Sequence, residues 1–93
     1  MNMIIRGTEK VTVGTSAKSV SINSKTFLMV NTSETATVYF KEAAEDGKAA
    51  TAANGFALLP GQMLRVPLCA RQLSMIASAA DTDVRILYLT EGL

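Results

Sequence analysis

Short segments in which apolar and polar residues alternate, each bounded by turn residues, are the feature that most constrains this chain. The stretch 54–68, NGFALLPGQMLRVPL, shows the pattern best. Asn54-Gly55 and Pro60-Gly61 are turn pairs, and in the second pair Pro fixes φ while Gly is free to adopt a positive φ. After that turn an apolar face alternates with a mixed face: Leu64, Val66 and Leu68 against Met63, Arg65 and Pro67. The stretch therefore predicts a strand, a tight turn and a second strand.

The same alternation recurs on both sides of this stretch, in residues 8–13, 17–22, 35–41, 73–77 and 83–89. The apolar residues that share one face in these segments are Val11 and Val13; Val20 and Ile22; Ala36, Val38 and Phe40; Leu73, Met75 and Ala77; and Val84, Ile86 and Tyr88. In the last segment Leu87 and Leu89 lie on the opposite face beside Arg85, so both faces carry apolar residues. We expect that final strand to be central in a sheet or to be sealed by a neighbouring subunit.

One segment has no alternation. Phe27-Leu28-Met29-Val30 is a continuous apolar run bounded by turn residues, which predicts a central strand covered on both faces. Phe27 and Met29 belong to one side of it, and Leu28 and Val30 to the other. The following residues, Asn31 to Glu34, are interpreted as a short hairpin connection to the next strand.

The count is about eight short strands, and no segment carries the i, i+3, i+4 apolar pattern of a long helix. This arrangement predicts an all-β fold: an antiparallel β-sandwich or small barrel, jelly-roll-like in type. A chain of 93 residues has room for one domain, which we place at residues 8–93. Residues 1–7 are interpreted as an N-terminal arm that either covers a sheet edge of its own subunit or reaches a neighbour.

The amino-acid composition indicates how the surface is charged and which partners it can bind. Apolar residues make up 48% of the chain and charged residues only 18%, below the roughly 25% of ordinary domains. Two explanations stay open: surface hidden against other subunits, or a neutral surface rich in Ser, Thr and Ala. The net charge is +1 and the basic residues are spread along the chain, which argues against nucleic-acid and polybasic membrane sites. No segment approaches the length of a membrane span, and the apolar core of the N-terminus is too short for a signal peptide.

Residues that carry chemistry are scarce. The chain has no histidine, and the single cysteine, Cys69, is interpreted as a small apolar residue at a strand end. Two carboxylate groups, one around Glu42, Glu45 and Asp46 and one at Asp81 and Asp83, could offer calcium ligands, but neither has EF-hand spacing. We therefore expect no catalytic residue, no cofactor and no metal site, and a protein that is not an enzyme.

The Ala-rich and charged stretch 42–53 is expected to be a long excursion between two strands. If the domain were a ligand-binding module, for example a carbohydrate-binding head, the loop contacts would be Glu42, Asp46, Lys48 and Asn54. The supply of aromatic residues weighs against sugar stacking, because the chain has three Phe, two Tyr and no Trp.

Four pieces of the chain, in order, carry a resemblance to a known family. They are Val11-Thr12-Val13-Gly14-Thr15; Val30-Asn31-Thr32-Ser33 followed by Thr35-Ala36-Thr37-Val38-Tyr39; Asn54-Gly55-Phe56-Ala57-Leu58-Leu59-Pro60-Gly61-Gln62; and the closing Asp83-Val84-Arg85-Ile86-Leu87. Together they resemble small β-sandwich proteins of tailed bacteriophage virions, of the head decoration or head/tail accessory type. The match runs from about Thr8 to Leu89 and leaves out the arm and the 42–53 loop.

The resemblance implies a non-enzymatic virion structural protein, made in the host cytoplasm. Its leading version is a capsid decoration (cement) protein that binds the assembled shell as a small oligomer such as a trimer. Its partners would be copies of itself and the major capsid or another virion protein, with no nucleic acid and no membrane. Other versions are a tail, neck or fibre-attachment component and a carbohydrate- or receptor-binding module of a phage tail. The candidate partner contacts are Met3, Ile4 and Ile5 in the arm and Tyr39, Leu87 and Leu89 on outward strand faces.

Overall fold

The computed structural model describes residues 3–22, 26–42, 48–66 and 72–91. These ranges contain eight strands and no helix. The strands are β1 (Met3–Val13), β2 (Lys18–Ser21), β3 (Thr26–Asn31), β4 (Val38–Glu42), β5 (Phe56–Leu58), β6 (Met63–Val66), β7 (Gln72–Ala77) and β8 (Thr82–Glu91). The predicted all-β fold of about eight strands is thus confirmed.

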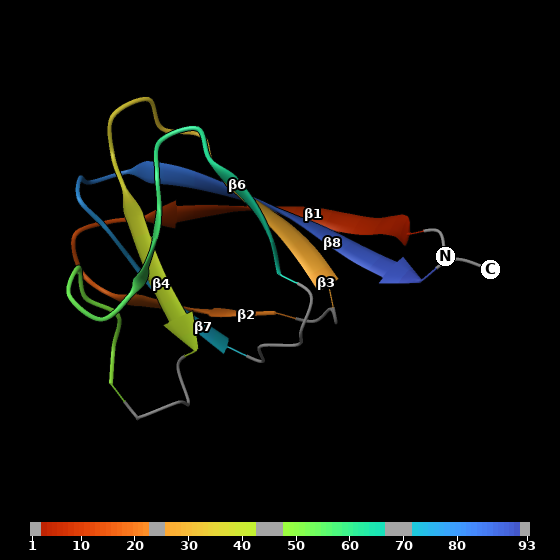
Figure 1. The fold of residues 1–93 in the computed structure, drawn as a ribbon, viewed down its shortest axis with the longest axis horizontal. Helices are drawn as coiled ribbons and strands as arrows, with labels where there is room; N and C mark the ends of the chain where they lie inside the picture. The colour runs from red at the N-terminus through yellow and green to blue at the C-terminus, as the bar shows by residue number, and fades with distance from the viewer. Residues whose placement is uncertain (1–2, 23–25, 43–47, 67–71, 92–93) are drawn as a thin grey trace.

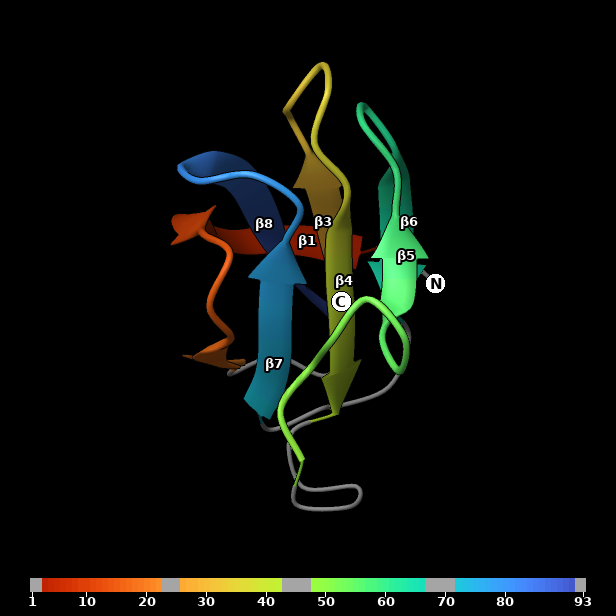
Figure 2. The ribbon, with the colours of Figure 1, turned by 90° about the vertical axis from the view of Figure 1, so that its left-hand side faces the viewer.

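The strands form two antiparallel four-stranded sheets that pack face to face (Figure 2). One sheet has the order β1-β8-β3-β6 and is called the β1 sheet; the other has the order β2-β7-β4-β5 and is called the β2 sheet. Pairing joins the first strand to the last, the second to the seventh, the third to the sixth and the fourth to the fifth. This is the order of a jelly roll, in which one long hairpin is folded over into two sheets. Of the predicted alternatives, the structure is therefore the sandwich.

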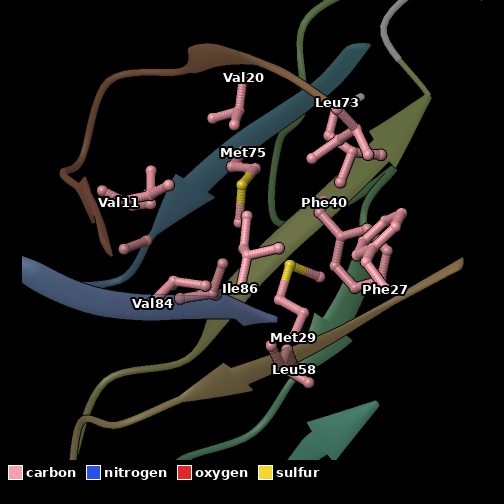
Figure 3. Close-up of a cluster of buried hydrophobic side chains, with 14 residues drawn as sticks. Val11, Val20, Phe27, Met29, Phe40, Leu58, Leu73, Met75, Val84 and Ile86 are labelled. Atoms are coloured by element: carbon pink, nitrogen blue, oxygen red, sulfur yellow. The ribbon is translucent and has the colours of Figure 1, made fainter. Parts of the chain in front are cut away.

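The core lies between the two sheets and consists of the inward residues of both (Figure 3). The alternating faces predicted from the sequence are those that the structure buries: Val11, Val13, Val20, Ile22, Ala36, Val38, Phe40, Leu73, Met75, Ala77, Val84 and Ile86. Tyr88 packs against this cluster while half-buried. The largest fully buried side chains include Phe27 and Met29, each of which stabilises the fold by about 1.5–3 kcal/mol through burial.

β3 lies between β8 and β6, as its apolar run predicts. Phe27 and Met29 point into the core and are fully buried. The prediction that both faces of β3 are covered is wrong, because Leu28 and Val30 on the outer face are only half-buried. The other sheet packs against one face of β3 only. β8 is likewise central, between β1 and β3, which confirms one of the two alternatives for the final strand.

The connection from Asn31 to Glu34 is not a hairpin, contrary to the prediction. β3 belongs to the β1 sheet and β4 to the β2 sheet, so the chain crosses between layers at this point. The Pro60-Gly61 turn joins β5 to β6 and crosses back. Gly61 has a φ of 74°, which confirms the predicted positive φ. Turn residues are the same for a hairpin and for a crossing between sheets, so the local sequence does not separate the two.

β1 begins at Met3 and pairs with β8 over its whole length, from Met3 opposite Glu91 to Val13 opposite Thr82. Residues 3–7 of the expected arm therefore lie in the sheet of their own chain. The register shifts once, between Ile5 and Gly7, which indicates a bulge at this point. The two strands extend together beyond the rest of the sandwich, toward the end where both termini lie (Figure 1).

Candidate functional site

The outer face of the β2 sheet is partly covered by the protein's own chain. Residues 48–55 fold back across this face before β5 begins (Figure 2). The Ala50 backbone N–H donates to Ser74 Oγ at 2.8 Å, and Lys41 Nζ donates to the Lys48 carbonyl at 2.9 Å. Ala50, Ser74 and Lys41 are buried as a result, at 1%, 4% and 8% exposure. The described part of the 42–53 excursion is thus an ordered cover for this sheet.

Replacing Ser74 with alanine is expected to loosen this cover without unfolding the domain. The substitution leaves the buried Ala50 N–H without its acceptor, which costs about 1–3 kcal/mol. Hydrogen exchange of the Ala50 amide should accelerate by about tenfold or more while the amides of β3 keep their protection. Ser19→Ala, an exposed change on neighbouring β2, is the matched control and should leave the Ala50 exchange rate unchanged. An unchanged rate in Ser74→Ala would contradict the role of this hydrogen bond.

The predicted Asn54-Gly55 turn closes the covering loop. Asn54 Oδ1 accepts from the Thr51 N–H at 2.6 Å, and Asn54 Nδ2 donates to the Ala49 carbonyl at 3.1 Å. The Gly55 N–H donates to the Thr51 carbonyl at 2.9 Å. The side chain of Asn54 therefore already holds its own loop together.

The predicted loop contacts reach different places. Glu42 ends β4 half-buried, Lys48 is exposed at the start of the covering loop, and Asp46 and Cys69 lie outside the described residues. Glu42 and Asn54 line one shallow hollow of about 440 Å³ between β5 and β6. Other residues that line it are Phe40, Lys41, Phe56, Leu64, Arg65 and Val66. The structure thus brings two of the four predicted loop contacts together.

Phe56 is the exposed aromatic residue of this hollow, at 58% exposure. Its ring packs against that of Phe40, with 5.6 Å between centroids and a tilt of 56°. The alternation in residues 56–58 gave no reason to expect Phe56 on the surface, since an aromatic residue in such a strand is more often buried.

The outer face of the β1 sheet differs from that of the β2 sheet. Register pairs Thr8 and Leu28 with Leu87, and pairs Lys10 and Val30 with Arg85. It also pairs Val30 with Met63 and Leu28 with Arg65. Opposed residues of neighbouring strands share one face, so these eight residues form a single surface, called here the β1-sheet face: Thr8, Lys10, Leu28, Val30, Met63, Arg65, Arg85 and Leu87.

The β1-sheet face is apolar at its centre and basic around it. Leu28, Val30 and Leu87 are half-buried, and Met63 is 62% exposed. Seven of the eight residues, all but Arg65, line a hollow of about 420 Å³ that is open to solvent. Two carboxylates that the structure describes lie beside this face. Asp83 accepts from Arg85 Nε at 3.0 and 3.1 Å, and Glu9 lines the hollow and accepts from Tyr88 Oη.

The predicted partner contacts are separated by the fold. Leu87 lies in the β1-sheet face, whereas Ile4 and Ile5 lie on β1 near the termini and are 50% and 64% exposed. Leu89 is buried, and Tyr39 is half-buried on the outer side of the β2 sheet, where its Cβ lies against Gly55. Met3 lies in β1, but the structure does not describe its side chain.

Sequence reasoning missed Leu28, Val30 and Met63 as surface contacts. The two-residue period of a strand placed Leu28 and Val30 on the side opposite Phe27 and Met29, which is correct. The local sequence gives no signal for this exposure, because the path of the 42–53 excursion decides which sheet is covered.

Tyr88 and Glu9 join β8 to β1 next to these surfaces. Tyr88 Oη donates to the Glu9 carboxylate. Burial of the Tyr88 side chain, followed by this hydrogen bond and the carboxylate charge, raises the pKa of the phenol. The phenol is therefore neutral at physiological pH and serves as a hydrogen-bond donor between the strands.

In residues 3–22, 26–42, 48–66 and 72–91, no three metal-ligating side chains are grouped as a metal site would need. The same ranges contain no helix of the length and apolarity required to span a bilayer. No protein-family model, no curated protein and no solved structure matches this chain. We therefore infer function from the geometry of the surfaces and from the motifs in the sequence.

Proposed function

We propose that this protein is a non-enzymatic structural component of a bacteriophage virion, in its leading version a capsid decoration protein that binds the assembled shell as an oligomer. The observation that carries the proposal is the β1-sheet face, an apolar surface that no described segment of the chain covers. The sequence motifs resembling phage virion proteins support it. A jelly roll hosts many functions, so the fold by itself does not favour one.

Self-association is assigned to the edge strand β1. β1 has 11 residues and lies at the end of its sheet, and Ile4 and Ile5 on it are exposed. A long edge strand with exposed apolar residues is a site at which another chain adds by strand pairing or side-chain packing. This leaves the β1-sheet face for a different partner, the shell.

In other versions of the proposal the protein keeps its structural role but belongs to a different part of the virion, as a tail, neck or fibre-attachment component. The hollow with Phe56, Glu42 and Asn54 favours one further alternative, a carbohydrate- or receptor-binding module of a phage tail. There the exposed ring of Phe56 would contact the sugar, the Glu42 carboxylate would accept hydrogen bonds, and the second Nδ2 hydrogen of Asn54 would donate one.

Light scattering behind a sizing column, over a dilution series, tests the proposal. We expect an oligomer that survives dilution, and we expect Ile5→Lys to reduce its mass to the 9.9 kDa of the monomer. Lysine at an exposed edge opposes strand addition. Leu59→Lys is the matched control, since Leu59 is 54% exposed at the β5–β6 corner, and it should keep the oligomer.

The second measurement adds the protein back to purified shells of its phage that were assembled without it. Saturable binding supports the decoration role. A monomer at every concentration that also fails to bind shells would overturn it, and a glycan array would then test the alternative module.

A further inference from the structure

We infer that the β1-sheet face docks onto a protein surface that is apolar at its centre and carries carboxylates around that centre. The inference deepens the proposed structural role and rests on it. It names the face of this chain that meets the partner and the chemistry that the partner must present.

The outer faces of the β1 and β2 sheets differ. The outer face of the β2 sheet carries Tyr39 and Ile76, both half-buried, and is partly covered by the loop that Ser74 and Lys41 hold in place. The β1-sheet face has four apolar outward residues, Leu28, Val30, Met63 and Leu87. Met63 is exposed, the other three are half-buried, and the hollow that they line is open to solvent. An apolar patch rimmed by polar residues on a small domain marks a site of protein contact.

The charged residues around the apolar centre of the β1-sheet face are mainly basic. Lys10, Arg65 and Arg85 surround the apolar centre from three different strands, and all three are exposed. The neighbouring carboxylates are Asp83, which pairs with Arg85, and Glu9, which lines the hollow, so three cations against two carboxylates leave an excess of positive charge. Carboxylates on the partner would complement it, raise the rate of association and set the orientation of docking.

The same charges disfavour a second copy of this chain as the occupant. Two β1-sheet faces packed against each other around a two-fold axis would bring together two surfaces that each carry this excess of positive charge. Like charges opposed across an interface cost free energy and select against that pairing. This is why self-association is assigned to β1 and docking to the β1-sheet face.

Nucleic acid and lipid fit the face less well. Polybasic membrane sites gather roughly four to eight Lys or Arg residues, and phosphate backbones require a similar concentration of charge. Here the three cations are separated by an apolar centre. An apolar centre with a sparse charged rim is the anatomy of a protein–protein interface.

The test uses a labelled amphipathic helical peptide of about 14 residues in which Glu flanks a stripe of Leu, followed by fluorescence anisotropy. Two comparison peptides replace either every Glu with Lys or every Leu with Ser. The Glu/Leu peptide should bind at least about tenfold more tightly than either comparison peptide, and salt raised from about 50 to 500 mM should weaken its binding.

Two substitutions on the face have matched controls off it. Leu87→Thr and Lys10→Glu should each weaken binding of the Glu/Leu peptide by about tenfold. Leu59→Thr and Lys18→Glu make the same chemical changes at exposed positions elsewhere and should bind as the unmodified protein does. Threonine suits a strand, and the unfolding temperature of each variant verifies that the fold is retained.

Equal binding of the Lys/Leu peptide would overturn the inference, as would unchanged binding in both face variants. Binding to phosphatidylserine vesicles that Lys10→Glu abolishes would also overturn it, by identifying a membrane as the partner. Binding to shells distinguishes a failure of this inference from a failure of the proposed function. If the protein binds shells and the two face variants bind equally well, the inference fails and the structural role stands. If the unmodified protein does not bind shells, the structural role fails whatever the peptides show.

Discussion

Replacing Asn31 with alanine is expected to lower the free energy of unfolding by about 4 kcal/mol, measured by urea denaturation. The side chain is fully buried at the point where the β3–β4 and β5–β6 crossings between the sheets meet. Its Nδ2 donates to the Ala36 carbonyl at 2.8 Å and to the Leu58 carbonyl at 3.0 Å, and its Oδ1 accepts from the Ser33 N–H at 3.0 Å. Alanine leaves these groups without partners.

The backbone of Asn31 adds to this connection. Its N–H donates to the Gln62 carbonyl at 3.0 Å, and its carbonyl accepts from the Gly61 N–H at 2.8 Å. One residue therefore holds the β3–β4 crossing against the β5–β6 crossing. Each buried group left without a partner costs about 1–3 kcal/mol, and a domain of this size has about 5–15 kcal/mol in all. The loss is accordingly a large share of the stability.

Asn31→Asp is the isosteric control, and its effect should depend on pH. The carboxylate lacks the two donors and would face two carbonyl oxygens, so burial and these oxygens raise the pKa of the introduced group in the folded state. A group with a raised folded-state pKa destabilises the fold once the unfolded chain ionises. The deficit relative to the unmodified protein should thus be smallest at about pH 4 and grow by about 1.4 kcal/mol per pH unit above it, up to the folded-state pKa.

Urea titrations at about pH 4 and pH 7 measure this difference. The Asn31→Ala deficit should be the same at both pH values, because alanine does not titrate. A deficit in Asn31→Asp that is independent of pH would mean that the introduced carboxylate is solvated, and would contradict the burial of this position.

Asn31 also shows where sequence reasoning succeeded and where it stopped. The two-residue period of a strand placed Phe27 and Met29 on one side, which the structure shows to be the core side, and the same parity puts residue 31 inward. An asparagine next to Thr, Ser and Glu was nevertheless interpreted as an ordinary turn residue of a hairpin, because that is the commoner setting. The local sequence does not state which strands a turn connects, and the crossing depends on pairing between strands far apart in the chain.

The candidate surface was predicted in part for a similar reason. Leu87 was expected on an outward face because Val84 and Ile86 beside it are core residues, and the structure agrees. Leu28 and Val30 were expected to be covered, since a continuous apolar run is typical of strands buried on both faces. Whether a face is covered depends on the path of distant loops. Here the loop that covers a sheet lies over the β2 sheet, not over the β1 sheet.

Gly55 lies in this loop, and Gly55→Ala should lower the free energy of unfolding by about 3 kcal/mol. A Cβ at this position would lie 2.8 Å from Tyr39 Cβ, 3.0 Å from the Thr51 carbonyl oxygen and 3.1 Å from Phe40 N. Two of these atoms belong to the backbone, and the third is fixed to the backbone of β4. None of them can rotate away as the end of a long side chain could, so either the loop or β4 must move.

Three other glycines provide the controls in the same urea measurement. A Cβ at Gly7 or Gly14 meets nothing within 4 Å, so alanine there should be neutral or stabilise by up to about 1 kcal/mol through the unfolded state. Gly61 also has open space but a φ of 74°, so alanine should cost about 1 kcal/mol of backbone strain. The expected order of destabilisation is Gly55, then Gly61, then the other two.

If Gly55→Ala proves as stable as Gly14→Ala, the loop must be able to lift away from β4 at little cost. The outer face of the β2 sheet would then be open as well, and the difference between the two outer faces would be lost. The assignment of docking to the β1-sheet face depends on that difference. A loss of stability that is larger in Gly55→Ala than in all three control variants would instead support a fold that covers one sheet itself and leaves the other for a partner.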